Sequence, residues 1–135
     1  MFKCEHFNIK ELVSQAVYAE RGEKAWQLLD ERALKTLDTL REVFGSTIVN
    51  DWQWGGVNEY RGFREPNCKV GARYSQHRFG RAFDCHFRDV SAGEAREYIL
   101  QHPEKFPYIA SIEMNVTWLH FDVRNYGPEV LKFNP

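Results

Sequence analysis

The sequence predicts an α+β fold in which N-terminal helices pack on a small, mostly antiparallel sheet. Two observations favour this class. Apolar residues recur at three- and four-residue spacing between residues 9 and 44, as in amphipathic helices. From residue 47 onward, short stretches rich in β-branched and aromatic residues alternate with loops. A chain of 135 residues has the size of one domain, so we treat residues 1–135 as a single domain with a helical part, 9–44, and a second part, 47–124.

Two helices are expected in the first part. Asn8 is a candidate N-cap for a helix from residue 9 to about residue 19. Gly22 separates it from a second helix, over about residues 23–44, and Gly45 follows the last periodic residue as a stop signal. We interpret the apolar stripe along both helices as the scaffold on which the sheet packs.

The second part is expected to form the sheet and one more helix. Residues 47–49, 81–87, 108–113 and 117–123 have the composition of short strands, and the last two are expected to pair as a hairpin. Ser91 caps a helix over residues 92–101, and Glu94 completes a capping box. The aperiodic stretch 52–76 is expected to be a functional loop, and the last dozen residues an irregular tail.

Composition and charge exclude several classes of function. Eighteen Lys and Arg residues nearly balance nineteen Asp and Glu residues, so no nucleic-acid-binding surface is expected. No stretch reaches the roughly 18 apolar residues of a membrane span. The first residues lack the apolar core of a signal peptide, so we expect synthesis in the cytoplasm. Separately, we expect the protein to be a monomer. Three cysteines without a Cys-x-x-Cys pair argue against a disulfide framework and a cysteine-based structural zinc site.

Two segments carry candidate metal ligands. His77 and Asp84 lie seven residues apart, with Gly80 between them to let the chain turn. His120 and Asp122 lie on one predicted strand and point to the same side, so one can ligate while the other hydrogen-bonds the ligand from behind. Zinc binds imidazole nitrogen and carboxylate oxygen, and three protein ligands leave a fourth position for water. The sequence therefore predicts one zinc site at His77 and Asp84, completed from the strand that carries His120 and Asp122.

These segments resemble a known family. The pattern Ser-x-His-x-x-Gly-x-Ala-x-Asp over residues 75–84, followed by Trp-x-His-x-Asp over 118–122, is similar to the M15 family of zinc D-Ala-D-Ala carboxypeptidases and bacteriophage murein endopeptidases. Residues 62–64 look like the family's Gly-x-Arg element, and the resemblance spans roughly residues 49–124. It implies the Hedgehog/DD-peptidase-like fold and a zinc peptidase that hydrolyses peptidoglycan stem peptides at D-Ala-D-Ala or at L-Ala-D-Glu.

The resemblance also implies roles for single residues. His77, Asp84 and His120 would be the zinc ligands. Arg64 would bind the substrate carboxylate or polarise the scissile carbonyl, and Ser75 would hydrogen-bond the bound peptide. The alternatives are a surface arginine for Arg64 and a turn-capping hydroxyl for Ser75.

The general base departs from the family pattern. Many members have a glutamate three residues before the second histidine ligand, where this chain has Thr117. Glu113, seven residues before His120, is our candidate because a hairpin would place it across from that histidine. Asp122 is the second candidate, although we favour a structural role for it.

Two other functions stay open. A non-catalytic zinc module that binds a partner, as in Hedgehog-like domains, is favoured by Thr117. A non-haem iron oxygenase also uses two histidines and one carboxylate, but the helical first third disfavours it. The missing signal peptide favours a phage lysis enzyme that a membrane-permeabilising partner releases. Residues expected either to line the site or to pack elsewhere are Trp52, Trp54, Tyr60, Phe63 and His86.

Overall fold

Three α-helices and a five-stranded sheet make up the structure, a computed structural model that describes residues 1–135. The helices are α1 (Gln15–Arg21), α2 (Glu31–Phe44) and α3 (Ala92–Gln101). The strands are β1 (Thr47–Ile48), β2 (Ala82–Phe87), β3 (Ser111–Glu113), β4 (Leu119–Asp122) and β5 (Leu131–Phe133). Their order in the sheet is β1-β2-β4-β3-β5, and every neighbouring pair is antiparallel except β3 and β5. The α+β class and the mostly antiparallel sheet are confirmed.

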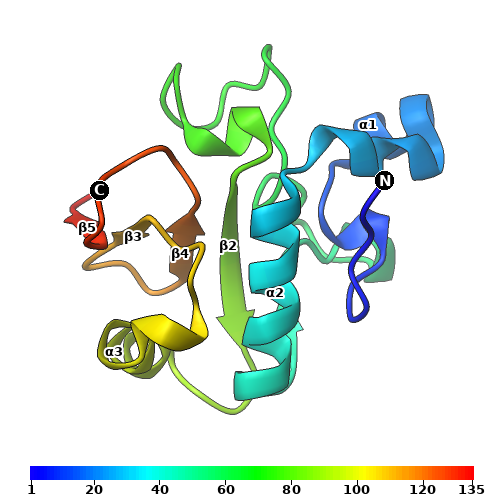
Figure 1. The fold of residues 1–135 in the computed structure, drawn as a ribbon. Helices are drawn as coiled ribbons and strands as arrows, with labels where there is room; N and C mark the ends of the chain where they lie inside the picture. Colours follow the sequence, from blue (N-terminus) through cyan, green and yellow to red (C-terminus); the bar gives the residue numbers. More distant parts are fainter.

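The helices and the sheet share one apolar core. In Figure 1, α2 passes in front of β2, and α3 packs against β2 and β4. Alternate residues of the strands point into this core and are fully buried: Phe83, Cys85, Ile112, Leu119 and Phe121. Each such large side chain stabilises the fold by roughly 1.5–3 kcal/mol. None of the helices combines the length and the apolar character that crossing a bilayer requires.

The predicted helix over residues 9–19 is wrong as a single element. Asn8 does cap a helical turn, but this is a short 3-10 helix at Ile9–Glu11. Ser14 then starts α1, because its hydroxyl accepts a hydrogen bond from the Val17 N–H at 3.2 Å. A second capping residue therefore divides the apolar stripe into two short helices.

The predicted helix over residues 23–44 is also divided. Residues Gly22–Leu28 form a 3-10 helix, Leu29 is extended, and Asp30 caps α2. The Asp30 N–H donates to the Gly80 carbonyl at 2.9 Å, so a tertiary contact accompanies the break. The predicted ends of α1 and α2 at Gly22 and Gly45 are confirmed, as are α3 and its capping box.

The predicted strands are present with shorter bounds, and one was missed. β3 and β4 pair as the expected hairpin, with Ser111 opposite Asp122 and Ile112 opposite Phe121. The irregular tail is wrong: residues Leu131–Phe133 form β5, parallel to β3. This strand places the end of the chain beside the site described below.

Gly80 makes the turn between the two parts of the first motif. The turn predicted at this glycine is confirmed, and its φ of +67° lies in the left-handed region. A Cβ at this position would lie 1.9 Å from the Leu28 carbonyl oxygen, which is backbone and cannot rotate away. The turn therefore requires glycine for both conformation and space.

Gly80→Ala should lower the free energy of unfolding far more than Gly55→Ala. Gly55 is also left-handed, with φ of +90°, but nothing lies within 4 Å of its Cβ position. We expect about 1–2 kcal/mol of destabilisation from conformation alone at Gly55. At Gly80 the overlap adds roughly 1–3 kcal/mol more. Urea unfolding of both variants measures the difference, and equal losses would contradict the close approach at Leu28.

Candidate metal centre

The register of the sheet places three polar residues in one row. Asp84 on β2 lies directly opposite His120 on β4. Continuing the β3–β4 register by one step beyond Ile112 and Phe121 brings Glu113 opposite His120 on its other side. Directly opposed residues share a face of the sheet. The face turned away from the core therefore presents Asp84, His120 and Glu113 side by side.

His77 reaches this row from outside the sheet. It lies on the 3-10 helix Gln76–Phe79, where the Ser75 hydroxyl accepts a hydrogen bond from the His77 N–H at 3.3 Å. The ring is 2% exposed, and its Nδ1 is 2.9 Å from the Gly62 carbonyl oxygen. Because a carbonyl oxygen can only accept a hydrogen bond, Nδ1 of the neutral ring carries the proton and Nε2 keeps its lone pair free.

Gly62 lets its segment take this position. A Cβ there would lie 2.1 Å from the Leu12 carbonyl oxygen, so the segment packs directly on the backbone of the N-terminal region. The next residue, Phe63, donates its N–H to the same carbonyl at 2.9 Å. The Gly-x-Arg element thus anchors the segment that orients His77.

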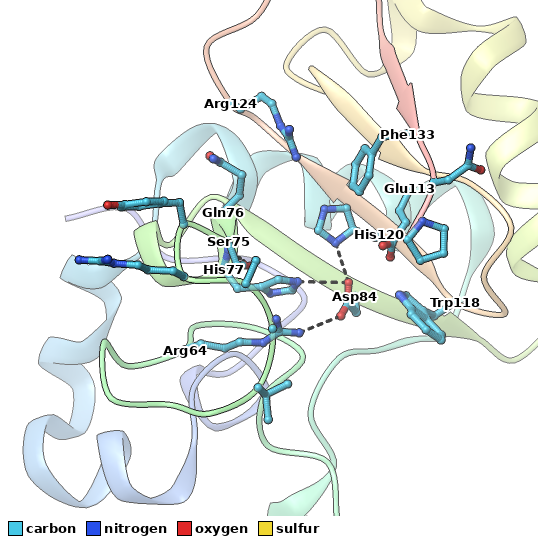
Figure 2. A pocket seen from close by; sticks show the side chains of 17 residues that line it. Arg64, Ser75, Gln76, His77, Asp84, Glu113, Trp118, His120, Arg124 and Phe133 are labelled. Atoms are coloured by element: carbon cyan, nitrogen blue, oxygen red, sulfur yellow. Dashed lines mark hydrogen bonds and ion pairs between the residues drawn. The ribbon is translucent and has the colours of Figure 1, made fainter.

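The three predicted ligands converge on one point. His120 Nδ1 is 2.8 Å and His77 Nε2 is 3.3 Å from the same oxygen of Asp84, Oδ1. Figure 2 shows both rings directed at this carboxylate. All three residues are buried, and their ligand atoms lie within 4.8 Å of one another. The structure thus brings together one carboxylate oxygen and two imidazole nitrogens, a donor set for a divalent metal ion.

Asp122 holds His120 from behind. Its Oδ2 is 3.0 Å from His120 Nε2, the ring nitrogen that faces away from Asp84. Arg124 donates to both oxygens of Asp122, at 2.7 and 2.6 Å, and Asp122 is fully buried. A carboxylate on the outer nitrogen orients a ligating imidazole and raises its basicity. The geometry places Asp122 behind His120 and away from the cavity.

The electrostatics of the group differ between its two histidines. Burial lowers the pKa of His77. Burial also lowers the pKa of His120, but its hydrogen bonds to Asp122 and Asp84 outweigh this and raise it to about 9. Burial raises the pKa of Asp84, yet the hydrogen bond from the protonated His120 outweighs this and holds the pKa well below its usual range. At neutral pH the metal-free group thus contains a carboxylate, a protonated His120 and a neutral His77.

This charge state fits a bound cation. The lone pair of neutral His77 Nε2 and Asp84 Oδ1 face each other at 3.3 Å, and two acceptors at this distance repel unless a cation lies between them. His120 Nδ1 carries a proton that a metal ion displaces on binding. A metal ion is therefore compatible with all three donors, although two nitrogens and one oxygen do not single out zinc.

Arg64 is neither on the surface nor free. It is 9% exposed, its Nε donates to the Tyr60 carbonyl at 2.7 Å, and its Nη2 donates to Asp84 Oδ2 at 3.3 Å. Burial lowers its pKa, and the charge of Asp84 opposes that shift. The surface alternative for Arg64 is wrong, and its direct partner in the structure is a candidate metal ligand.

A cavity of about 650 Å³ opens beside the three ligands. Arg64, Ser75 and Glu113 line it together with His77, Asp84 and His120. Ser75 therefore both caps a turn and faces the cavity. Thr117, in contrast, is exposed and does not line the cavity.

The sequence analysis did not predict the other walls of the cavity. Residues 70–74 form one wall, and Phe133 of β5 with the two residues after it forms another. The Phe133 ring lies 5.5 Å from the His120 ring, and Arg124 lies over Phe133. Only the β-type composition of residues 130–133 hinted at a strand there. Trp118 was a position of the second motif without a predicted role, and it also lines the cavity.

The aromatic residues of the 52–63 segment do not line the cavity, so the groove-wall interpretation is wrong for them. Phe63 belongs to the core, and the Trp52 indole donates to the Val13 carbonyl at 2.9 Å. Trp54 is exposed. His86 shares the strand of Asp84 but lies opposite Ile48 on β1, away from the cavity.

Comparisons of the chain with family models, with curated proteins and with solved structures found no match. The resemblance to M15 peptidases therefore stays a prediction carried by the two motifs.

One divalent metal ion should bind per chain at the buried group. Zinc at a hundredfold excess over its dissociation constant should stabilise the protein by about 2.7 kcal/mol. His77→Ala should abolish this stabilisation, measured by titration calorimetry and urea unfolding. His6→Ala is the control. His6 lies with Glu5 and Glu42 in an exposed cluster on the surface, so this variant should leave zinc binding unchanged. Equal zinc affinity in the wild type and His77→Ala would place the ion elsewhere.

The metal-free protein should lose stability as the pH rises toward 9. His120 has a pKa of about 9 instead of 6.5, so its contribution is complete below about pH 6.5 and disappears as the pH rises through 9. The loss has an upper limit of about 3 kcal/mol. Urea unfolding with a chelator at pH 6 and 9.5 measures it. Asp122→Asn should shrink this pH dependence, since it removes the carboxylate on Nε2; an unchanged slope would contradict the assignment.

Proposed function

We propose that the protein is a zinc-dependent peptidase that hydrolyses an amide bond of peptidoglycan stem peptides, at D-Ala-D-Ala or at L-Ala-D-Glu. The observation that carries the proposal is the buried group of His77, Asp84 and His120 beside a cavity that also contains a carboxylate outside the ligand set, Glu113. A metal site used only for structure has no need of such a cavity or of an uncommitted acid. The substrate class comes from the motif resemblance.

His77, Asp84 and His120 would hold the ion. Bound there, zinc would supply a Lewis acid and a lowered pKa for a water molecule. The three ligands are held by partners of their own: the Gly62 carbonyl on His77 and the Asp122 carboxylate on His120. These contacts keep the ligand nitrogens, His77 Nε2 and His120 Nδ1, directed at one point before an ion binds.

Glu113 is the residue we assign as general base. Its register position opposite His120 puts it on the ligand face of the sheet, and its side chain is only half buried. It would take a proton from the attacking water and pass it to the leaving amine. Asp122, the second candidate, is fully buried and bonded to both His120 and Arg124, which favours its structural role.

Arg64 and Ser75 are the residues we assign to substrate binding. Both line the cavity next to Asp84 and His77. Two Arg64 nitrogens are engaged with Tyr60 and Asp84, which leaves Nη1 to donate to a substrate oxygen. The Ser75 hydroxyl accepts from the His77 N–H and keeps its own hydrogen for a peptide carbonyl.

A non-catalytic metal module that binds a partner is the alternative function. The exposed position of Thr117 favours it, because no acid stands where many family members have one. Release into the wall during phage host lysis is a further part of the proposal and comes from the sequence alone.

Glu113→Gln should abolish hydrolysis while zinc binding persists. Removing a general base typically lowers the rate by about 10²–10⁴-fold. Purified peptidoglycan and a synthetic stem pentapeptide containing both candidate bonds are digested with zinc-loaded protein, and new termini are identified by mass spectrometry. Glu129→Gln serves as the matched control, because this exposed acid lies outside the cavity. Full activity of Glu113→Gln would reject Glu113 as the base, and no product from the wild type would favour the binding module.

A further inference from the structure

One of the four tryptophans has an unusual environment. The Trp26 indole nitrogen donates to Glu23 Oε1 at 3.4 Å, and that of Trp52 donates to the Val13 carbonyl at 2.9 Å. Trp54 is 63% exposed, so water solvates it. The Nε1 of Trp118 is buried and has no hydrogen-bond partner within the protein. Native structures rarely leave a buried N–H without an acceptor, so this one requires an explanation.

Trp118 lies at the candidate metal centre. It immediately precedes β4 and lines the same cavity as the metal ligands. Its carbonyl oxygen accepts a hydrogen bond from Arg96 of α3 at 2.8 Å, which fixes its backbone. Figure 2 shows the indole nitrogen on the side of the ring that faces Asp84 and Glu113. The unpaired donor therefore points into the site.

Glu113 is within reach of this donor. Glu113 is opposite His120 in the register, and Trp118 lies two residues before His120 along the chain. Trp118 and Glu113 are thus diagonal neighbours on one face of the hairpin, a separation that aromatic and long side chains span. The hydrogen bonds and ion pairs of the site centre on Asp84 and Asp122 and do not include Glu113.

Asp84 is the other nearby carboxylate, but its oxygens are already engaged. Oδ1 is contacted by His77 and His120, and Oδ2 accepts from Arg64. Glu113 is therefore the acceptor that remains for the indole.

We propose that Trp118 is a positioning residue for Glu113: its indole N–H donates a hydrogen bond to the Glu113 carboxylate and holds it toward the metal ligands. The inference rests on the proposed role of Glu113 as general base. An unattached glutamate samples several rotamers, and fixing one oxygen on a rigid indole leaves the other directed at the attacking water. The pairing also supplies the acceptor that the buried N–H lacks.

Nuclear magnetic resonance tests the contact without using activity. Four indole N–H resonances are expected, and Trp118→Phe identifies the relevant one by its disappearance. In zinc-loaded and in metal-free protein, this resonance should move in Glu113→Gln, because the variant replaces the charged acceptor with a neutral amide. Trp54→Phe is the control that leaves it unchanged. A Trp118 resonance that is the same in the wild type and in Glu113→Gln would overturn the proposal.

Kinetics test the consequence. Trp118→Phe keeps an aromatic ring at this position but removes the N–H donor, so kcat should fall about tenfold or more. KM and zinc affinity should stay within about twofold, and Trp54→Phe should behave as the wild type. A raised KM with unchanged kcat would mean that the indole binds substrate, and a weakened zinc affinity would mean that it bonds Asp84; either result overturns the proposal. A wild type without hydrolytic activity would contradict the proposed function instead, and the resonance experiment would then decide this inference.

Discussion

The pairing of Asp84 with His120 across β2 and β4 is the constraint on which the site depends. A slip of one residue in either strand would turn that strand's ligand to the other face of the sheet and dismantle the ligand set. What prevents the slip is the opposite face, where Phe83 and Phe121 are opposed and fully buried in the core. The apolar core therefore specifies the position of the metal ligands from the opposite face of the sheet.

Burial of charge is the second condition. Asp84 and Asp122 are almost inaccessible, and an isolated carboxylate would lose several kcal/mol of solvation there. Both stay ionised because the charges alternate in space: Arg64 on Asp84, His120 between the carboxylates, and Arg124 on Asp122. A divalent ion that replaces the proton on His120 preserves this alternation. The same arrangement that stabilises the metal-free protein thus also prepares the group for a cation.

The sequence predicted the features that depend on short-range chemistry. The cap of α3, the stops at Gly22 and Gly45 and the turn at Gly80 each follow from a few neighbouring residues. The candidate ligands were found because their spacing within two short segments is characteristic. The breaks before α1 and α2 were missed because apolar periodicity continues through them. β5 was missed because a three-residue strand becomes recognisable only from its pairing with β3. The unpaired indole of Trp118 is likewise a three-dimensional property.

The wall formed by residues 70–74 shows how an irregular segment acquires a defined position. Arg78 donates hydrogen bonds to four carbonyl oxygens of the preceding loop, those of residues 65, 66, 68 and 72. A lysine has no planar fork of donors and could not satisfy so many acceptors in different directions. Arg78 also follows His77 directly in the same 3-10 turn. The turn that presents a metal ligand on one side therefore organises the cavity wall on the other, so a displacement of this turn would move ligand and wall together.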